Sequence, residues 1–322
     1  MTRLTNDSAD LVARTDFTGP ELRFDFPSFQ IGVAEYDEGP TGCTVFHFPD
    51  GAACATDVRG GSPGTIGGYE WVEAICLAGG SLYGLEAAAG VAAELFAQHG
   101  HSTEWTEIAL VSGAIIFDYG PRENSVYPDK ALGRAALRAA RPGLFPLGPR
   151  GAGRSATVGK TFEYSQGEPA GQGGAYRELG LTKLAVFTVV NAVGGIVDRD
   201  GEVVRGHLDR ATGLRSRVVA GVEERLTAGA PLRQLPGNTT LTVVVTNQRL
   251  DRRALRQLGR QVHASMARAI HPFHALLDGD VLYAVTTAEV QNEALDPIAL
   301  SVVASELAWD AVLASFEPDE AD

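Results

Sequence analysis

A threonine at the entrance to a strongly β-prone segment is the first residue whose position suggests chemistry. Gly237, Asn238 and Thr239 lead into a run of β-branched and apolar residues at 240–246, which is typical of a buried strand. If the bond before Thr239 is cut, a new α-amino group with an ordinary pKa of about 7.7–8.0 stands beside the hydroxyl group. That amine can accept the hydroxyl proton near neutral pH, and this activates an N-terminal threonine as a nucleophile. A plain Gly-Asn-Thr turn into a strand has the same sequence and is common.

Two aspartates form the second candidate. Asp278 and Asp280 flank Gly279 and stand just before an apolar run at 281–287. Residues i and i+2 of an extended chain point to the same side, so the two carboxylates can together hold an ammonium and a hydroxyl group. A hairpin turn with two solvated acids is the simpler interpretation of this segment taken alone.

Lysine is rare in this chain, and Lys160 lies in a glycine-rich segment. Lys130, Lys160 and Lys183 are the only lysines among 27 Lys+Arg residues. Residues 153–161 resemble a nucleotide-binding P-loop, but five residues instead of four separate the glycines. The residues that follow are too rich in Gly, Pro and Gln to open a helix. The sequence therefore predicts no nucleotide site, and no cofactor is expected.

Two histidines close to the aspartate pair raise the question of a metal. His271 and His274 lie a few residues before the pair. Pro272 breaks any helical spacing of the two imidazoles, and no third nitrogen or sulfur ligand stands nearby. The sequence therefore predicts no metal site.

The surrounding segments alternate between strand and helix patterns. Strands are predicted at 30–36, 43–48, 107–118, 183–191, 237–246 and 281–287, and helices at 80–99, 129–140, 251–270 and 293–314. A hairpin is predicted through Asp200-Gly201. Residues 146–176 form the loosest part of the chain. Residues 212–235 have little apolar pattern and are predicted to form a mobile linker, which is usually functional inside a domain.

Composition and charge exclude several classes of protein. The chain has 322 residues, 44% of them hydrophobic, which is enough for a large core without disulfides. The net charge of -13 argues against nucleic acid or an anionic membrane as a partner, and no apolar stretch reaches the roughly 18 residues of a membrane span. The three cysteines form no CxxC motif, and the first residues lack the apolar core of a signal peptide. These features predict a cytoplasmic protein.

Six stretches together resemble the DmpA/NylC group of self-processing N-terminal-nucleophile amide hydrolases. They keep the order of that family along most of the chain: LAGGSLYGLEAAAGV (77–91), VSGAIIFDYG (111–120), TVGKTFEYSQG (157–167), KLAVFTVVNAVGGIVD (183–198), GNTTLTVVVTN (237–247) and LLDGDVLYAVTT (276–287). The group includes aminopeptidases for β-amino and D-amino residues and endo-type hydrolases of 6-aminohexanoate (nylon) oligomers. A threonine nucleophile with two aspartates looks like the nylon-oligomer branch, because the aminopeptidase branch carries serine and a different acid pair.

The resemblance implies one catalytic domain over residues 1–322 that cuts itself between Asn238 and Thr239. The products would be an α-fragment, 1–238, and a β-fragment, 239–322. The implied fold is an αββα sandwich of the α+β class, assembled as a homotetramer of α/β heterodimers. Thr239 would then be the nucleophile for short linear amides, with no cofactor.

The same resemblance assigns roles to five further residues. Asp278 and Asp280 would orient the new amine and stabilise its cationic form. Lys160 would add positive potential near the nucleophile, and Asn191 would donate a hydrogen bond to the developing oxyanion. Tyr119 would bind or position the substrate.

Two other activities fit the same family pattern. A β-peptidyl or D-stereospecific aminopeptidase would remove single residues from the amino end of its substrate. An ornithine acetyltransferase-like enzyme would transfer an acyl group and also uses a self-generated N-terminal threonine, but the usual surroundings of that nucleophile differ from GNTTLTVVV.

Overall fold

The computed structural model describes residues 3–230 and 237–317. The helices are α1 (Leu85–Gln98), α2 (Lys130–Arg138), α3 (Val218–Thr227), α4 (Arg252–Ser265) and α5 (Pro297–Leu313). The main sheet contains β1 (Ala13–Arg14), β3 (Gln30–Tyr36), β4 (Thr41–Val58), β5 (Thr65–Ile66), β6 (Trp71–Ala78), β7 (Val111–Ile115), β11 (Gln172–Leu179), β12 (Thr182–Asn191), β15 (Thr239–Gln248) and β17 (Val281–Val290). Short strands outside it are β2 (Glu21–Arg23), β8 (Leu144–Pro146), β9 (Thr157–Val158), β10 (Glu168–Pro169), β13 (Gly195–Val197), β14 (Val203–Arg205) and β16 (Ile270–His271).

The main sheet forms two layers because β4 is long enough to belong to both. β4 pairs with β3 and β6 mainly through residues 41–47, and with β17 through residues 53–58. One core lies between the layers, where the rings of Phe46 in β4 and Phe187 in β12 are 5.3 Å apart.

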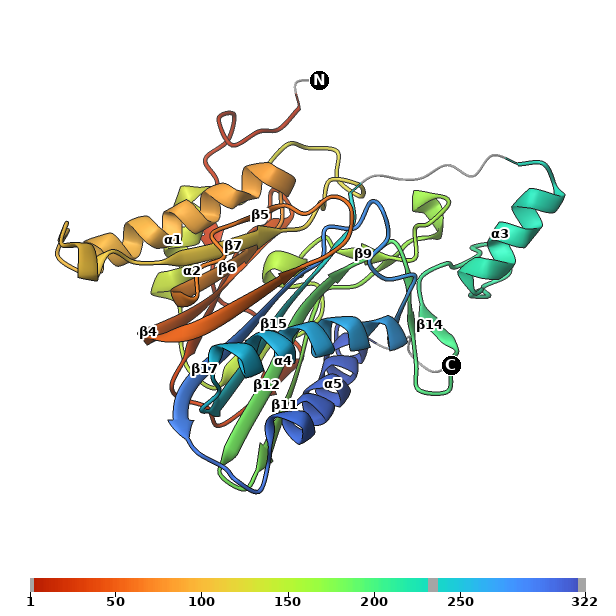
Figure 1. Ribbon diagram of the computed structural model, residues 1–322. Coiled ribbons are helices and arrows are strands. Elements are labelled where there is room, and N and C mark those ends of the chain that lie inside the picture. The colour runs from red at the N-terminus through yellow and green to blue at the C-terminus, as the bar shows by residue number, and fades with distance from the viewer. Residues whose placement is uncertain (1–2, 231–236, 318–322) are drawn as a thin grey trace.

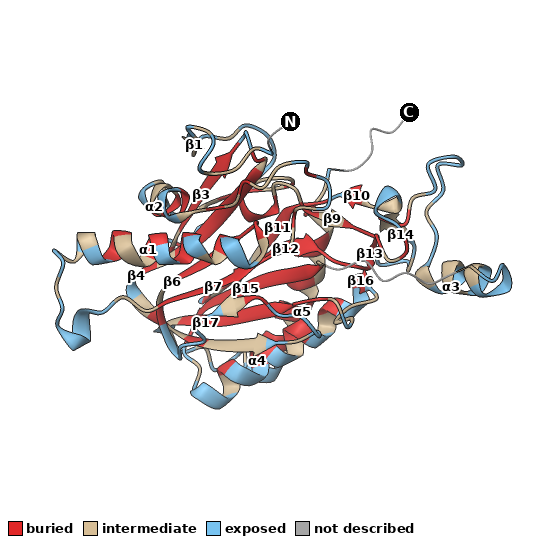
Figure 2. Ribbon diagram, turned by 90° about the horizontal axis from the view of Figure 1, so that it is seen from above, coloured by how far each residue is buried: buried red, intermediate tan, exposed pale blue. Residues whose placement is uncertain are grey.

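Helices cover both outer faces of this double sheet (Figures 1 and 2). α1 and α2 pack on the layer of β3, β4, β6 and β7, and α4 and α5 pack on the layer of β11, β12, β15 and β17. Each helix pair buries its apolar side on one sheet, which leaves the sheets to pack on each other. The fold is therefore the expected αββα sandwich.

α4 shows how the sequence fixes these helices. Its apolar residues Leu255, Leu258 and Val262 recur at helical spacing and are buried against the sheet. Asp251 caps its start by accepting a hydrogen bond from the backbone N–H of Ala254 at 2.7 Å. No helix within residues 3–230 and 237–317 has the length and apolar character needed to cross a membrane.

The strand register brings separate parts of the chain to one edge of the sheet. β12 and β15 are antiparallel, and their register pairs Asn191 with Thr239. β15 and β17 are parallel, and an additional bridge pairs Asn238 with Asp278 just before the two strands. The end of β12 and the starts of β15 and β17 therefore meet, although 39 residues lie between Asn238 and Asp278 in the sequence.

Most elements predicted from the sequence are confirmed. β3 has the predicted bounds of 30–36, β12, β15 and β17 fall on predicted strands, and α1, α2, α4 and α5 fall on predicted helices. β13 and β14 form the predicted hairpin. The prediction for residues 146–176 was incomplete, because β11 at its end is a full strand of the main sheet.

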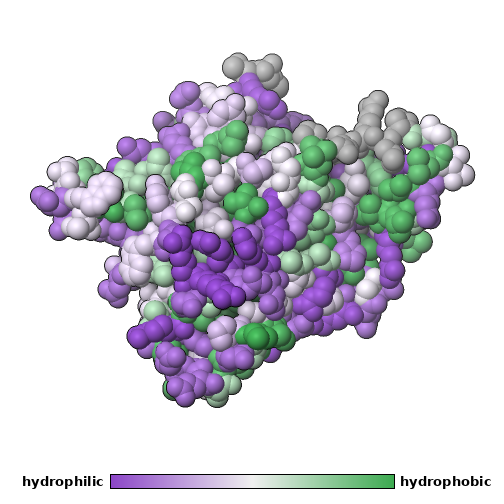
Figure 3. Space-filling view, in the orientation of Figure 1, coloured by the Kyte–Doolittle hydropathy of each residue, from purple (hydrophilic) through white to green (hydrophobic). Residues whose placement is uncertain are grey.

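The prediction of a linker at 212–235 was wrong for its central part, which is helix α3. No residue of α3 is buried, although Val218, Val222 and Leu226 recur at helical spacing. α3 projects from the body of the molecule (Figure 1). Its side chains include exposed Val219 and Leu226, and hydrophobic surface is visible there in Figure 3. Residues 231–236 of the predicted linker lie outside the described residues.

Candidate active site

The hydroxyl group of Thr239 lies against the peptide bond that precedes it. Thr239 is the first residue of β15 and is 3% exposed. Its Oγ1 donates a hydrogen bond to the carbonyl oxygen of Asn238. The backbone N–H of Gly279 donates to the same oxygen at 3.0 Å. Two donors therefore polarise this carbonyl group, and one of them belongs to the atom that would attack it.

The close approach of Gly279 depends on its lack of a side chain. A Cβ atom there would lie 2.4 Å from the carbonyl oxygen of Ser62 and 3.0 Å from both Cα of Pro63 and Oγ1 of Thr239. The first of these distances is too short for any real contact. A larger residue would push the backbone N–H away from Asn238, so glycine is required at this position.

Asp278 is fully buried and titrates in the neutral range. Its carboxylate accepts hydrogen bonds from the backbone N–H groups of Val193 at 3.3 Å and Ala275 at 2.9 Å. Burial and the charge of Asp280 raise the pKa of Asp278 to about 7, although the two N–H donors and Lys160 oppose this rise. Asp278 can therefore gain and lose a proton near neutral pH, as a general acid or base must.

Asp280 ties β17 to the strand of the nucleophile. It is fully buried, and its Oδ1 accepts a hydrogen bond from the backbone N–H of Thr240 at 2.7 Å. Its Oδ2 accepts from the backbone N–H of His274 at 3.2 Å and from Nδ1 of the same residue at 2.8 Å. Asp280 thus fixes the residue next to Thr239.

Lys160 lies beside β12 in the segment between β9 and β10. Its ammonium nitrogen donates to the carbonyl oxygen of Thr157 at 2.5 Å and to Oδ1 of Asn191 at 3.0 Å. Burial lowers the pKa of Lys160 to about 7, against the attraction of Asp278, which raises it. The positive charge expected for this lysine is therefore complete only below neutral pH, and Lys160 exchanges its proton in the same range as Asp278.

Asn191 does not have the arrangement expected of an oxyanion donor in the intact chain. Its Nδ2 donates to the carbonyl oxygen of Phe117 at 2.9 Å. Its Oδ1 accepts from Lys160 and from a backbone N–H of β9. Asn191 therefore positions Lys160 beside the register partner Thr239, while the N–H of Gly279 takes the place at the carbonyl oxygen.

Tyr119 lies at the edge of this cluster. Its half-buried ring contacts the ring of Phe117, with 5.7 Å between the two ring centroids. The guanidinium carbon of Arg122 lies over the Tyr119 ring, 4.4 Å from its centroid. Phe117 in turn packs against Gly237, where a Cβ atom would lie 2.2 Å from its ring. Burial raises the pKa of Tyr119 to about 12, so the phenol keeps its proton.

The structure thus brings Thr239, Asp278, Asp280, Lys160 and Asn191 into one connected cluster, with Tyr119 one aromatic ring away. Sequence reasoning missed two participants, the backbone N–H of Gly279 and the imidazole of His274. Both stood in segments that had been singled out for other reasons, the aspartate pair and the histidine pair.

The two histidines of the pair have different surroundings. His274 donates to Asp280, whereas His271 is an exposed residue of β16. Within the part of the chain that the structure describes, no three His, Cys, Asp or Glu side chains are grouped so that they could hold a metal ion.

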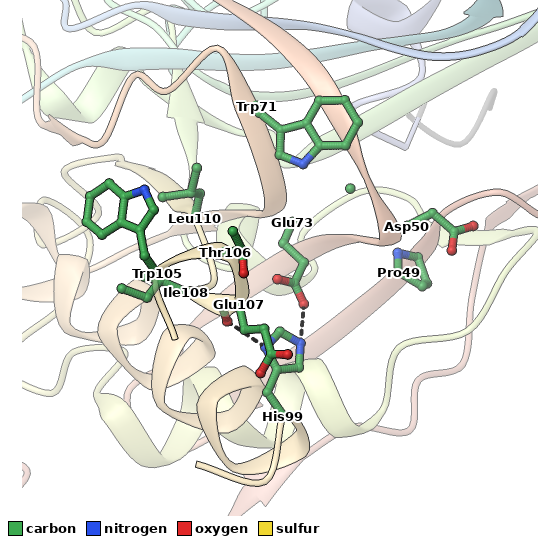
Figure 4. A pocket seen from close by; sticks show the side chains of 11 residues that line it. Pro49, Asp50, Trp71, Glu73, His99, Trp105, Thr106, Glu107, Ile108 and Leu110 are labelled. Atoms are coloured by element: carbon green, nitrogen blue, oxygen red, sulfur yellow. Dashed lines mark hydrogen bonds and ion pairs between the residues drawn. The ribbon is translucent and has the colours of Figure 1, made fainter. Parts of the chain in front are cut away.

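A cavity of about 650 Å³ lies elsewhere, between the β4 bend, the start of β6 and the segment after α1 (Figure 4). Trp71 and Trp105 line it together with Glu73, and His99 bridges Glu73 and the backbone of Glu107. None of the six predicted site residues lines this cavity. Its walls therefore contribute nothing to the chemistry around Thr239.

Comparison with known proteins identifies the family. Residues 24–317 match peptidase family S58. A 6-aminohexanoate-oligomer endohydrolase from Paenarthrobacter ureafaciens is 49% identical over 319 residues, which cover 96% of this chain and 89% of that protein. An uncharacterized aminopeptidase from Mycobacterium tuberculosis is 33% identical over 274 residues, which cover 81% of this chain and 78% of that protein.

A solved structure confirms the fold. The L-aminopeptidase D-Ala-esterase/amidase from Ochrobactrum anthropi, described as a variant of the Ntn hydrolase fold, superposes with a TM-score of 0.59 at 16% identity. The match covers 94% of this chain and 88% of that one. With the Ntn hydrolase fold and a family match over most of its length, the chain belongs to peptidase family S58.

Proposed function

We propose that this chain is a self-processing amide hydrolase that cuts its own Asn238–Thr239 bond and then uses Thr239 as its nucleophile. One observation carries the proposal: Oγ1 of Thr239 and the N–H of Gly279 both donate to the carbonyl oxygen of Asn238. A hydroxyl and an oxyanion donor on one peptide group are the two parts that acyl transfer needs.

The first reaction would be an acyl shift within the chain. Oγ1 of Thr239 attacks the carbonyl carbon of Asn238 while the N–H of Gly279 stabilises the negative oxygen. The hydroxyl proton passes to a neighbouring base, for which Lys160 and Asp278 both titrate near neutral pH, and then to the departing nitrogen of Thr239. Water hydrolyses the resulting ester, which leaves a carboxylate on Asn238 and a free amine on Thr239.

The buried state of the intact site supports this order of events. Thr239 is 3% exposed and Asn238 is 2% exposed, so an external substrate cannot reach the hydroxyl group in the uncut chain. Cleavage frees Asn238 to withdraw with the end of the α-fragment, and the oxyanion position at Gly279 then becomes available to a substrate carbonyl group.

During turnover, the free amine of Thr239 would take the hydroxyl proton and return it to the leaving amine of the substrate. Asp278 and Asp280 lie at the start of the neighbouring parallel strand and would orient this amine. Lys160 would supply positive charge on the other side, through Asn191.

We propose oligomers of 6-aminohexanoate as the substrate class, cut at internal amide bonds. The support is the name and the 49% identity of the Paenarthrobacter relative, with which this chain aligns over 96% of its length. A second candidate is removal of single residues from an amino end, which the aminopeptidase relative favours. The buried acid pair would then hold the ammonium group of the substrate.

The assembly and the location of the protein are part of the same proposal. We expect a homotetramer of α/β heterodimers in the cytoplasm, with no metal, cofactor or nucleic acid. The three cysteines are free and buried, which suits a reducing compartment. Sedimentation of the processed protein would measure the number of subunits.

Product analysis tests the activity. Fully processed protein is incubated with a linear 6-aminohexanoate oligomer, and early products are separated by chromatography and weighed. Internal cleavage releases shorter oligomers of several lengths at once, whereas an aminopeptidase releases single units first. Processed protein that hydrolyses neither this oligomer nor an aminoacyl amide would contradict the proposal, and Thr239→Val protein is the matched inactive control.

A further inference from the structure

A series of contacting side chains connects Asp280 to the molecular surface. Nδ1 of His274 donates to Asp280 at 2.8 Å, and the ring of His263 meets the ring of His274 edge-on at 4.5 Å and 88°. Nδ1 of His263 lies 2.9 Å from Oδ2 of Asp57, to which Arg59 donates at 2.7 Å. His263 belongs to α4 and Asp57 to β4, and His274 lies between β16 and β17. Three separate segments therefore contribute to this series of side chains.

The carboxylates decide which ring nitrogen carries the proton. An ionised carboxylate only accepts hydrogen bonds, so ionised Asp57 requires the proton on Nδ1 of His263. Donation to an ionised Asp280 would likewise place the proton on Nδ1 of His274. Nε2 of both rings is buried and has no hydrogen-bond partner among the described residues. A second proton on either ring would therefore have no acceptor. Burial also lowers the pKa of His263, although the hydrogen bond to Asp57 opposes this.

The outer end of this series of side chains, at Asp57, is permanently charged. Burial alone would raise the pKa of Asp57, but hydrogen bonds from His263 and Arg59 lower it to about 2. Asp57 is therefore ionised at any pH at which the protein is used, and it holds His263 in the Nδ1–H form. The backbone N–H of Arg59 also donates to the carbonyl oxygen of Asp280 at 2.8 Å. This hydrogen bond joins the two ends of the series of side chains.

We propose that His274 is a positioning residue that fixes the carboxylate of Asp280 against Thr240, so that Asp278 is the acid of the pair that exchanges the proton. The inference rests on the proposed function, because it assigns a role within the self-cleavage and hydrolysis reactions. His274 acts through Asp280 and touches no reacting atom.

The distribution of donors supports this division. Three N–H groups donate to Asp280, one from Thr240 and two from His274, and hydrogen bonds to the charged form favour it. Only two N–H contacts among the described residues reach Asp278, at 3.3 and 2.9 Å. Two adjacent buried carboxylates cannot both be ionised at low cost, so the proton is held by Asp278.

The charged and titratable groups around Asp280 are consistent with this assignment. Asp278 adjoins it on its own segment, and Lys160 lies beyond Asp278. His274, His263, Asp57 and Arg59 face it on the opposite side.

The backbone of His274 is itself adapted to this contact. Its φ of 58° lies in the left-handed region, which few residues other than glycine, asparagine, aspartate and histidine adopt. In this conformation both its backbone N–H and its Nδ1 reach the same oxygen of Asp280. The histidine pair of the sequence therefore contains an anchor for a carboxylate in place of a metal ligand.

Two substitutions at this position separate the hydrogen bond from the ring. His274→Gly removes the donor and tolerates the positive φ. His274→Asn also tolerates it, and its side-chain N–H can occupy nearly the position of Nδ1. His101→Asn is the matched control, because His101 has a φ of 60° and is exposed.

The rate of self-cleavage and the pH profile of hydrolysis are measured for each variant. We expect His274→Gly to slow self-cleavage about tenfold or more and to shift the acid limb of hydrolysis, because the side-chain donor that fixes the Asp280 carboxylate is removed. His274→Asn should recover most of the rate and the position of the acid limb. A wild-type rate and an unmoved acid limb in His274→Gly would overturn the proposal.

A spectroscopic readout tests the proposal even where cleavage fails. In Thr239→Val protein with ¹⁵N-labelled histidine, the signals lost in His274→Asn identify His274. The proposal requires a neutral Nδ1–H ring at pH 7, and an Nε2–H ring or an imidazolium would overturn it. A wild-type chain that never cuts itself would instead contradict the proposed function, while this readout still decides the role of His274.

Discussion

Strand β15 has a buried polar cluster at each end, and the two clusters differ in chemistry. At its start, Thr239 adjoins Asp278, Asp280 and, through Asn191, Lys160. At its other end, the buried polar side chains are neutral: Thr182, Thr246, Asn247, Gln248 and Thr286.

The neutral cluster has its side-chain hydrogen bonds satisfied by fixed partners. Oε1 of Gln248 accepts from Thr182 at 2.9 Å, and Nε2 donates to the carbonyl oxygen of Leu295 at 2.7 Å. Thr286 donates to the backbone of Gln248 at 2.6 Å. This cluster holds strand ends in register and contains no group that exchanges a proton near neutral pH.

The comparison separates polar groups that support the fold from those that suit a reaction. Buried ionisable groups weaken a fold unless they are paired, yet Lys160 and Asp278 both titrate at about pH 7. Perturbed titration of this kind is concentrated at functional sites. The start of β15 has the features of a reactive centre, and the end of β15 has those of a structural joint.

The largest effect that this comparison predicts is at Thr239. Thr239→Val keeps the β-branched shape of the buried strand residue but removes the hydroxyl group. We expect an uncut chain of 34.0 kDa and a loss of hydrolysis of about 10³-fold or more, because no nucleophile remains. Gel electrophoresis and a hydrolysis assay measure both, and Thr239→Ser, which restores a hydroxyl group, should still be cut.

Lys160→Met is expected to lower both reaction rates by about 10²–10⁴-fold, the usual contribution of a proton-transferring group. It also removes the cation that lowers the pKa of Asp278, so the limb of the pH profile that Asp278 controls should move to higher pH. Lys183→Met is the control, since Lys183 pairs with Asp25 near the surface. Equal losses in the two variants would show that charge alone, wherever it lies, controls the rate.

Asp278→Asn should change how stability depends on pH. The pKa of Asp278 is raised from 3.8 to about 7 in the fold, so the wild-type fold loses stability as pH rises from about 4 to about 7. In the Thr239→Val background, the asparagine variant should lack this loss and gain of the order of 3 kcal/mol relative to its parent at pH 7. Thermal melts at several pH values measure this, and a constant difference across the range would contradict the shift.

Gln248→Met tests the other end of the strand. It should cost about 1–3 kcal/mol of unfolding free energy, because the buried Thr182 hydroxyl loses its acceptor and the carbonyl oxygen of Leu295 loses its side-chain donor. Self-cleavage and the pH profile should be unchanged, since no proton-exchanging group is touched. Gln257→Met, on the exposed side of α4, is the control for stability. A shifted pH profile in Gln248→Met would break the distinction between the two ends.

The smallest effect is expected at Tyr119, which lies outside the cluster. Tyr119→Phe keeps the ring contacts with Phe117 and Arg122 and should leave self-cleavage unchanged. If Tyr119 binds substrate, KM should rise a few-fold while kcat changes little. A large fall in kcat would instead place the phenol among the reacting groups.

The sequence predicted the individual reactive groups better than their arrangement. Thr239 and the aspartate pair stood out because each directly precedes a recognisable strand. Lys160 joins them because the segment at 146–176 folds back beside β12, and no helix or strand was predicted there that could orient its side chain. Its assignment depended on family resemblance.

Two features were beyond sequence reasoning for a physical reason. The donation from Gly279 to Asn238 depends on the direction of one backbone N–H group in a parallel bridge. The contact of His274 with Asp280 depends on a positive φ. Patterns of residue type do not encode either property. α3 was missed although Val218, Val222 and Leu226 recur at helical spacing in its sequence.

The central claim is that the buried Thr239 hydroxyl cuts the peptide bond on which it lies. Intact mass and N-terminal sequencing of freshly purified protein, followed during incubation at neutral pH, test it most directly. Two fragments of roughly 25 and 9 kDa are expected, in proportion to residues 1–238 and 239–322, with Thr239 as the second N-terminus. A single chain of 34.0 kDa that persists through long incubation, or a cut at another bond, would contradict it.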